Sequence, residues 1–326
     1  MAAQNEQPSN QDCGRPKILL HRAPSFGVTF LSGLYSHFDL IDPLVQSPPP
    51  EFLLSARVLL CVGPSPLNSD ALARLPSLQV IVGSSAGVDH IDLVECSRRG
   101  IAVTNVSSAF CEDVADCAVA LLLDVLRRIS AGHRYVRAGL WPVKDDFPLG
   151  FKLGSRRVGI LGLGSIGSEI AKRLVPFGCR IAYTARTEKP SIPFNYYGNA
   201  HDLAANSDVL IVCCALTEET HHVVSKDVMT ALGKEGVIIN VGRGALLDEE
   251  QLVQFLEKGE LAGAGLDVFE NEPNVPASLF ELDNVVLSPH CAVLTPESFE
   301  AMQDLVLANL KAFFSNQPLL SAVQID

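Results

Sequence analysis

The sequence lacks an excess of positive charge. It carries 25 lysine and arginine residues against 37 aspartate and glutamate residues, so the formal net charge of the 326-residue chain is −12 at pH 7. Proteins that bind nucleic acid neutralise phosphates with clustered lysine and arginine. Nucleic acid is therefore not an expected partner, and an anionic ligand would have to be held by a few local cations and backbone amides.

Long apolar runs are also missing. Runs such as Cys117–Leu123 are far short of the roughly 18 residues that a membrane-spanning helix needs. Residues 1–16 are polar and have neither the apolar core of a secretion signal nor the arginine-rich, acid-poor composition of a transit peptide. We therefore expect no membrane partner, and we expect residues 1–16 to be disordered.

Paired cysteines are the third absence. The chain has nine cysteines, an odd number, and no Cys-x-x-Cys pair. This pattern argues against a disulfide framework and against a structural zinc site, so no metal is expected. Most of the cysteines lie in apolar runs, which suits reduced thiols in the cytoplasm.

Short apolar runs alternate with helical segments along most of the chain, which predicts α/β architecture with parallel sheets. The helices expected first are 69–75 and 92–99, a loop is expected over 44–52, and one long helix is expected from Glu112 to Ala131. A last helix, 296–314, has no strand after it and is free to pack on the first domain. The predicted strands are 17–21, 57–62, 78–82 and 101–104 in a first series, then 157–161, 180–184, 208–213, 236–241, 262–268 and 284–287 in a second.

The strongest motif is the glycine-rich segment from Gly162 to Gly167. It follows a predicted strand and opens a predicted helix, which is the context that distinguishes a dinucleotide-binding turn from an ordinary glycine loop. Gly162 would make the tight turn, Gly164 would let the backbone approach a pyrophosphate, and Gly167 would let helix and strand pack closely. The second series of six strands is thus predicted to be a Rossmann domain.

The segment after the next strand, Ala185-Arg186-Thr187, indicates which dinucleotide is bound. An acidic residue at this strand end would bind the 2′-hydroxyl of NAD, but no carboxylate occupies it here. Arg186, with Lys189 nearby, could pair with the 2′-phosphate of NADP. We therefore expect NADPH (NADP+) as cofactor, with NADH weaker; the alternative is that Arg186 is a solvated surface residue.

Three charged residues fall at or just after the ends of later strands, where ligands bind in open α/β sheets. Arg243 can grip the carboxylate and keto oxygen of a 2-keto acid, and His290 can give a proton to that oxygen as a hydride arrives. Glu272, paired with His290, would favour the protonated imidazole. By contrast, His221 and His222 are predicted to be surface residues of a loop.

Five motifs in order resemble the D-isomer-specific 2-hydroxyacid dehydrogenases, and within that family the plant-type glyoxylate/hydroxypyruvate and hydroxyphenylpyruvate reductases. The similarity extends from about Lys17 to Asp326. The motifs are Ser85-Ala86-Gly87-Val88-Asp89, 162–167, Val241-Gly242-Arg243-Gly244, 265–273 (GLDVFENEP) and Ser288-Pro289-His290.

The resemblance implies two doubly wound parallel-sheet domains with the active site in the cleft between them. Residues 1–110 and 295–326 would form a discontinuous substrate-binding domain, and 111–294 the Rossmann NADP-binding domain. It also implies a homodimer, with an arm near Trp141 that reaches the partner's active site.

The resemblance further implies the site residues. Arg243, Glu272 and His290 would form the catalytic set, and backbone amides near Ala86 and Gly87, beside Ser85, would bind the substrate carboxylate with Arg243 and His290. The expected cofactor-binding residues are Gly162, Leu163, Gly164, Ser165, Ile166, Gly167, Ala185, Arg186, Thr187, Leu216, Thr217, Val241, Gly242, Arg243, Asp267, His290 and Ala292.

One departure from the family leaves the substrate open. The family usually has a Gly-Ser pair one residue after its catalytic histidine, where this chain has Ala292-Val293. The more apolar pair would favour a bulkier keto acid or lower the activity. The leading expectation is therefore an NADPH-dependent reductase of glyoxylate or hydroxypyruvate. The alternatives are a reductase of hydroxyphenylpyruvate or another bulky keto acid, and a non-catalytic NADP(H) sensor.

Overall fold

A computed structural model describes residues 14–27, 29–144 and 146–324, and these divide into two compact units. One unit comprises the chain to Asn105 together with the segment from Gln303, and the other comprises Val106–Met302. The division therefore lies near the expected boundaries at 110 and 294, although its second point falls inside a helix. The disorder expected for residues 1–16 falls mostly on residues 1–13, which lie outside the described residues.

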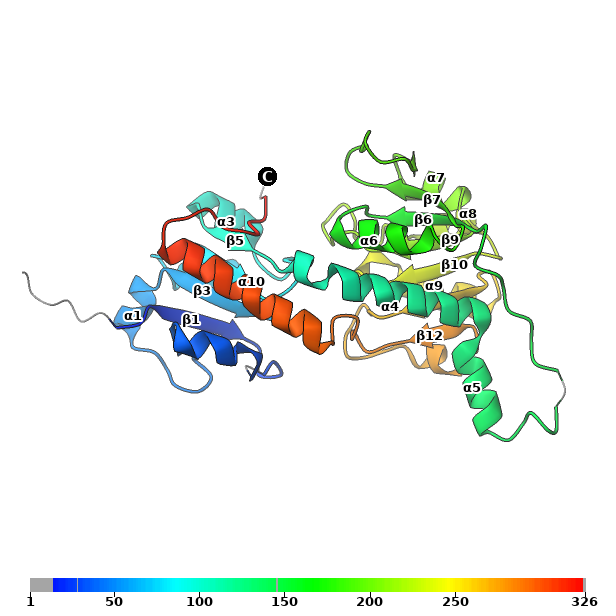
Figure 1. The fold of residues 1–326 in the computed structure, drawn as a ribbon, viewed down its shortest axis with the longest axis horizontal. Coiled ribbons are helices and arrows are strands. Elements are labelled where there is room, and N and C mark those ends of the chain that lie inside the picture. Colours follow the sequence, from blue (N-terminus) through cyan, green and yellow to red (C-terminus); the bar gives the residue numbers. More distant parts are fainter. Residues whose placement is uncertain (1–13, 28, 145, 325–326) are drawn as a thin grey trace, which may run out of the picture. The chain divides into compact units, whose positions relative to one another are not determined.

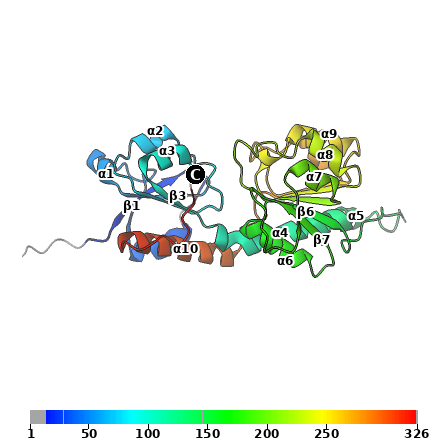
Figure 2. The same ribbon diagram turned by 90° about the horizontal axis from the view of Figure 1, so that it is seen from above.

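The first unit is built on a five-stranded parallel sheet in the order β2-β1-β3-β4-β5. Figure 2 shows α1, α2 and α3 on one face of this sheet and α10 on the other. The strands are β1 (Lys17–Arg22), β2 (Asp39–Ile41), β3 (Val58–Val62), β4 (Val80–Gly83) and β5 (Ala102–Thr104). The helices are η1 (Thr29–Ser36), α1 (Pro50–Ser55), α2 (Ser69–Ala73), α3 (Leu93–Arg99) and α10 (Pro296–Phe314).

The last helix packs on the first unit, as its sequence allowed. The ring of Phe314 lies 5.7 Å from that of Phe38, and the Arg57 guanidinium lies over the Phe313 ring. Beyond the helix, the chain returns to the edge of the sheet, where the Val323 amide donates to the Val103 carbonyl. The first unit is therefore assembled from both ends of the chain.

The second unit holds a seven-stranded parallel sheet in the order β12-β11-β10-β9-β6-β7-β8. Helices α4 and α6 cover one face and α7, α8 and α9 the other (Figures 1 and 2). The strands are β6 (Arg157–Leu161), β7 (Arg180–Thr184), β8 (Asn195–Tyr196), β9 (Val209–Val212), β10 (Val237–Asn240), β11 (Gly263–Leu266) and β12 (Val285–Leu287). The helices are α4 (Ser107–Arg127), α5 (Ile129–Arg137), α6 (Ser165–Leu174), α7 (Ala200–Ala205), α8 (Lys226–Leu232), η2 (Gly244–Leu246), α9 (Glu249–Glu257) and η3 (Ala277–Glu281).

Four sequence expectations about elements were wrong. The strands β2 and β8 were missed, because both are short and neither is a run of buried apolar residues. The expected loop 44–52 contains the start of α1, whose first position is Pro50, a residue suited to helix starts. The expected helix 112–131 is two helices: Arg128 has φ 56°, and the Asp124 carboxylate accepts the Ser130 amide at 2.7 Å, which starts α5.

The central strands are buried along their whole length, as parallel strands covered on both faces must be. All four residues of β9 and of β10 are buried, which is why these segments are apolar in the sequence apart from Asn240 at the end of β10. Among the described residues, no helix is both long enough and apolar enough to cross a membrane.

Candidate active site

The chain reverses its direction of travel across the second sheet between β6 and β9. From β6 it runs outward through β7 and β8, then crosses back to β9, which pairs with the other side of β6, and continues to β12. In open α/β sheets, ligands bind at such a switch point, beyond the carboxyl ends of the strands. The glycine-rich turn directly follows β6 and so stands at this position.

Each motif glycine has a separate geometric requirement. Gly162 has φ 103°, and a Cβ there would lie 2.6 Å from the Cα of Cys214. A Cβ on Gly167 would lie 2.1 Å from the carbonyl oxygen of Gly162, so any side chain would push α6 off the turn. Gly164 instead faces open space, with no heavy atom within 4 Å of its Cβ position.

The open side of Gly164 is where α6 begins, with Gly164 itself as the N-cap. The first amides of a helix have no partner within the helix and attract anions together with the helix dipole. Ser165 is exposed and Ile166 is half-buried, whereas Leu163 is buried beneath the turn. These residues therefore fit a pyrophosphate held by backbone amides.

Lys189 is tied to the same turn. Its ammonium donates to the Leu163 carbonyl at 2.5 Å, and its amide donates to the hydroxyl of the buried Tyr183 at 2.8 Å. Arg186 and Thr187 are exposed just beyond the end of β7, which pairs with β6. Two cationic side chains thus follow the strand adjacent to the glycine turn, where a carboxylate would serve an NAD-specific site.

Arg243 is positioned by the end of β10. The Asn240 side chain donates to the Arg243 carbonyl at 2.9 Å and accepts the Gly242 amide at 3.0 Å. The Arg243 guanidinium is half-buried and donates to the Gly242 carbonyl at 2.8 Å. Val241, the first residue of this motif, is buried and holds the turn to the sheet.

Gly244 brings this arginine turn into direct contact with the turn that leads to Glu272. A Cβ on Gly244 would lie 1.9 Å from the carbonyl carbon of Phe269 and 2.2 Å from the amide nitrogen of Glu270. Such distances exclude every other residue unless one of the two backbones moves. The glycine therefore sets the distance between Arg243 and the acidic turn.

Glu272 and His290 form the acid–imidazole pair. The Glu272 Oε2 lies 2.7 Å from the His290 Nδ1, and its Oε1 accepts the Phe269 amide at 3.0 Å. Both side chains are about one-third exposed, at 35% each, so the imidazole can reach solvent or a ligand. With Nδ1 held by the carboxylate, Nε2 is the ring nitrogen left to exchange a proton with a bound molecule.

The pKa of Glu272 lies below its usual value. Burial opposes this shift, but the hydrogen bonds from His290 and the Phe269 amide outweigh burial, with help from the nearby charges of His290 and Arg243. Glu272 is therefore ionised at neutral pH, as a carboxylate must be if it is to orient an imidazole and stabilise its cation.

Asp267 fixes the loop that carries His290. Its carboxylate is buried and accepts hydrogen bonds from the Ser288 hydroxyl at 2.6 Å, the Cys291 amide at 2.9 Å and the Ala292 amide at 3.1 Å. The backbone of His290 has φ 49°, which is unusual outside glycine, and its amide donates to the Asp267 carbonyl. The Asp267 carboxylate thus positions the loop, while the cofactor contact expected for this residue stays a prediction.

The remaining expected residues are distributed over both units. Leu216 and Thr217 lie in the loop after β9, where the Thr217 hydroxyl donates to Glu219. Ser85, Ala86 and Gly87 follow β4 in the first unit, so they belong to a different sheet from the other site residues. There the Ala86 carbonyl accepts the Asn105 amide group, and the Ser85 hydroxyl is buried without a hydrogen-bond partner among the described residues.

His222 was expected, like His221, to be a surface residue of a loop, and the structure adds a contact that the sequence did not predict. Its side chain is 35% exposed, and its Nε2 lies 2.7 Å from the Glu270 Oε1. The sequence places these residues 48 positions apart and contains no periodicity that would join them, so this contact could not be predicted. His221 is exposed, as expected.

Two positioning residues, Asn240 and Gly244, were not given these roles from the sequence, although both flank the arginine motif. The signal for Asn240 is weak: a polar residue ending an otherwise apolar run next to a glycine. The close approach of Gly244 depends on a backbone from another strand and has no local sequence signal beyond the glycine itself.

Comparison with known proteins identifies a family that this chain matches. A sequence profile described as "D-isomer specific 2-hydroxyacid dehydrogenase, NAD binding domain" matches residues 119–292. The chain is 54% identical over 318 residues to a glyoxylate/hydroxypyruvate reductase of Arabidopsis thaliana, covering 95% of this chain and 98% of that protein. It is 48% identical to a hydroxyphenylpyruvate reductase of Plectranthus scutellarioides, covering 83% and 87% of the two chains.

A solved structure has the same fold. The NADPH-dependent glyoxylate/hydroxypyruvate reductase of Sinorhizobium meliloti, in complex with NADP and malonate, is 38% identical and superposes with a TM-score of 0.86. The match covers 95% of this chain and 97% of that one.

Proposed function

The chain belongs to the D-isomer specific 2-hydroxyacid dehydrogenase family and is an oxidoreductase that acts on CH–OH groups. On that premise, we propose that it reduces glyoxylate and hydroxypyruvate to the corresponding 2-hydroxy acids with NADPH. The observation that carries this proposal is the 2.7 Å pair of His290 and Glu272, held on loops that follow β11 and β12 in the sheet whose β6 leads into the dinucleotide turn. Curated relatives whose matches cover 95% and 80% of the chain bear the same activity in their names.

In the proposed reaction, bound NADPH supplies the hydride. His290 gives the Nε2 proton to the keto oxygen, and the ionised Glu272 stabilises the imidazolium before the transfer. Arg243 binds the substrate carboxylate and keto oxygen. In the first unit, we assign substrate binding to the backbone amides near Ala86 and Gly87.

The first test replaces His290 with Gln, which keeps a polar side chain of similar length. Loss of a general acid lowers the rate by about 10²–10⁴-fold, and we expect kcat with glyoxylate and NADPH to fall within that range. His201→Gln is the matched control, because His201 also lies beside a carboxylate, that of Asp202, but on the helix α7. A His290→Gln enzyme with wild-type kcat would refute the proposed acid.

We assign NADPH preference to Arg186 and Thr187, whose exposure beyond β7 leaves them accessible to a 2′-phosphate. Replacing Arg186 with Ala should raise the KM for NADPH by about tenfold or more, and leave the KM for NADH nearly unchanged, since a charge-assisted hydrogen bond to an ion contributes about 1.5–3 kcal/mol. Equal changes for both cofactors would show that Arg186 does not read the phosphate.

A hydroxyphenylpyruvate reductase is the second candidate. It is favoured by the 48% identity to such an enzyme and by the Ala292-Val293 pair after the histidine. Purified protein assayed with glyoxylate, hydroxypyruvate and hydroxyphenylpyruvate ranks the candidates by kcat/KM. Tight NADPH binding without turnover of any of the three would instead indicate a cofactor sensor.

The assembly and the domain roles complete the proposal. Residues 111–294 would bind the cofactor, and 1–110 with 295–326 would bind the substrate.

Trp141, Val143 and Leu149 are exposed by 68%, 76% and 93%, which supports an apolar arm covered by a second copy in a homodimer. Sedimentation of the wild type and of a Trp141→Ser, Leu149→Ser variant tests this, and a monomeric wild type would refute it.

We place the enzyme in the cytoplasm. The eight cysteines among the described residues are all free thiols, which suits a reducing compartment. A fluorescent fusion of the full chain that accumulates inside an organelle would contradict this location.

A further inference from the structure

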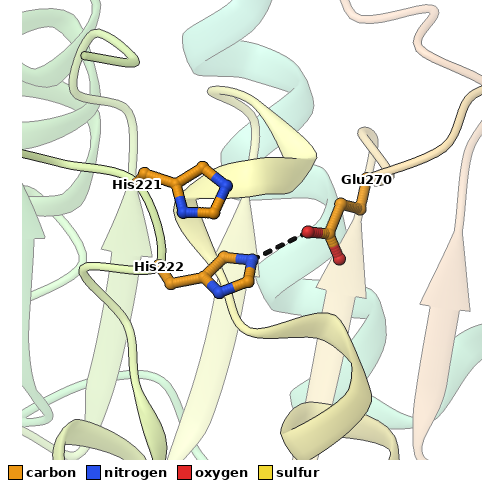
Figure 3. A group of neighbouring side chains, drawn as sticks. All are labelled: His221, His222 and Glu270. Carbon is orange, nitrogen blue, oxygen red and sulfur yellow. Dashed lines mark hydrogen bonds and ion pairs between the residues drawn. The ribbon is translucent and has the colours of Figure 1, made fainter. Parts of the chain in front are cut away.

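His221, His222 and Glu270 gather at one place in the second unit (Figure 3). Each offers one ligand atom, and these atoms all lie within 4.8 Å of one another. The two imidazoles are stacked, with ring centroids 4.0 Å apart, and Nε2 of His222 lies 2.7 Å from Oε1 of Glu270. Within 14–27, 29–144 and 146–324, this is the one such trio of metal-ligating side chains.

The backbone holds two of the three residues in place from outside the trio. His222 has φ 51°, and its amide donates to the Ala245 carbonyl at 2.8 Å, within the turn that follows Arg243. The Glu270 amide donates to the buried Glu249 carboxylate at 3.1 Å, and the close contact with Gly244 fixes the same peptide. These anchors lower the cost of bringing His222 and Glu270 to one ion, because their backbones are already ordered.

The donor set is that of a transition metal. Two imidazoles and one carboxylate suit zinc, copper or nickel better than calcium or magnesium, which prefer oxygen alone. Three protein ligands leave one tetrahedral position for water. Ligand atoms on a tetrahedral zinc are about 3.4 Å apart, given zinc–ligand bonds of about 2.0–2.1 Å. The site therefore closes when the exposed His221 side chain rotates out of its stack on His222 and the His222 and Glu270 ligand atoms separate from 2.7 Å to that distance.

We propose that His221, His222 and Glu270 bind one divalent transition-metal ion of the zinc class. Binding replaces the hydrogen bond between His222 and Glu270 with a bond from each to the metal, which requires that Nε2 of His222 carry no proton and that its ring proton reside on Nδ1. The site does not include Arg243, Glu272 or His290, so the proposal stands independently of the proposed reaction.

The test titrates Zn²⁺ into untagged, metal-free protein against a chromophoric chelator. We expect one ion per chain, and we expect His221→Ala and Glu270→Gln each to weaken the affinity by about tenfold or more, since even outer-shell changes cost 10–100-fold. His201→Ala is the matched control, because His201 is 59% exposed and also lies beside a carboxylate. Circular dichroism establishes that each variant is folded.

Co²⁺ then identifies the ligands. Absorption bands of a nitrogen- and oxygen-ligated ion that disappear in His221→Ala support the site. A sulfur-to-metal charge-transfer band would assign the ion to cysteine instead and overturn the proposal. An affinity for Zn²⁺ that is the same in the wild type, His221→Ala and Glu270→Gln would overturn it as well, and would leave the trio as a hydrogen-bonded pair beside a surface histidine.

Discussion

Gly244 joins the turn that carries Arg243 to the turn that leads to Glu272. Replacing Gly244 with alanine tests how far the site depends on that contact. The new Cβ would lie 1.9 Å from the Phe269 carbonyl carbon, whereas ordinary contact begins near 3.4 Å. One backbone must therefore move by about 1.5 Å, the difference between these two distances. The atoms that it meets belong to the backbone, so no side-chain rotation relieves the clash.

The Gly244→Ala substitution should lower both the unfolding free energy and kcat/KM. Overpacking a well-packed region costs about 1–3 kcal/mol of unfolding free energy, and we expect Gly244→Ala to reach the upper part of that range. Displacement of a positioned group by about 1 Å can lower the rate by about 10²-fold. We therefore expect kcat/KM for glyoxylate to fall by at least that factor, because Arg243 shifts relative to Glu272.

Urea unfolding followed by circular dichroism measures the first effect, and steady-state kinetics on the folded fraction measures the second. Gly198→Ala is the matched control, since no heavy atom lies within 4 Å of its Cβ position. If Gly244→Ala kept both the wild-type unfolding free energy and the wild-type kcat/KM, the inference that this contact positions Arg243 would be refuted.

Two further predictions concern buried carboxylates. Asp267→Asn places an N–H group where a carboxylate oxygen accepts hydrogen bonds from the His290 loop. The unfolding free energy should therefore fall by about 1–3 kcal/mol. An unchanged urea midpoint would contradict this role of Asp267. Burial, assisted by the nearby charges of Glu270 and Glu272, raises the pKa of Glu249 although the Glu270 amide opposes it. The folded state therefore binds the proton more tightly than the unfolded chain, and stability falls as pH rises from the ordinary glutamate pKa through the raised one. Glu249→Gln should reduce this slope in urea unfolding measured across that range, and a slope equal to that of the wild type would contradict the prediction.

The elements that carry the site could be located from the sequence because each has a local signal. The strand β9 is apolar throughout and β10 is apolar up to Asn240, since helices cover both faces of the sheet. The glycine turn could be identified because its glycines lie between a predicted strand and a predicted helix, and Gly167 packs on the Gly162 carbonyl within that unit. Elements without such a signal, as in the two-residue strand β8, were missed.

The sequence by itself determined the order of elements, the dinucleotide turn and the identity of Arg243, Glu272 and His290 as candidate groups, because these depend on local pattern and on residue chemistry. Only the tertiary structure decided how such groups are held: the Asp267 carboxylate on the His290 loop, the contact of Gly244 with Phe269, and the pairing of His222 with Glu270. The first two contacts join segments that follow neighbouring strands of the parallel sheet, and the third joins the segments that follow β9 and β11, on either side of β10. The register of the strands, and not the sequence of any one of them, sets the distances between these ends.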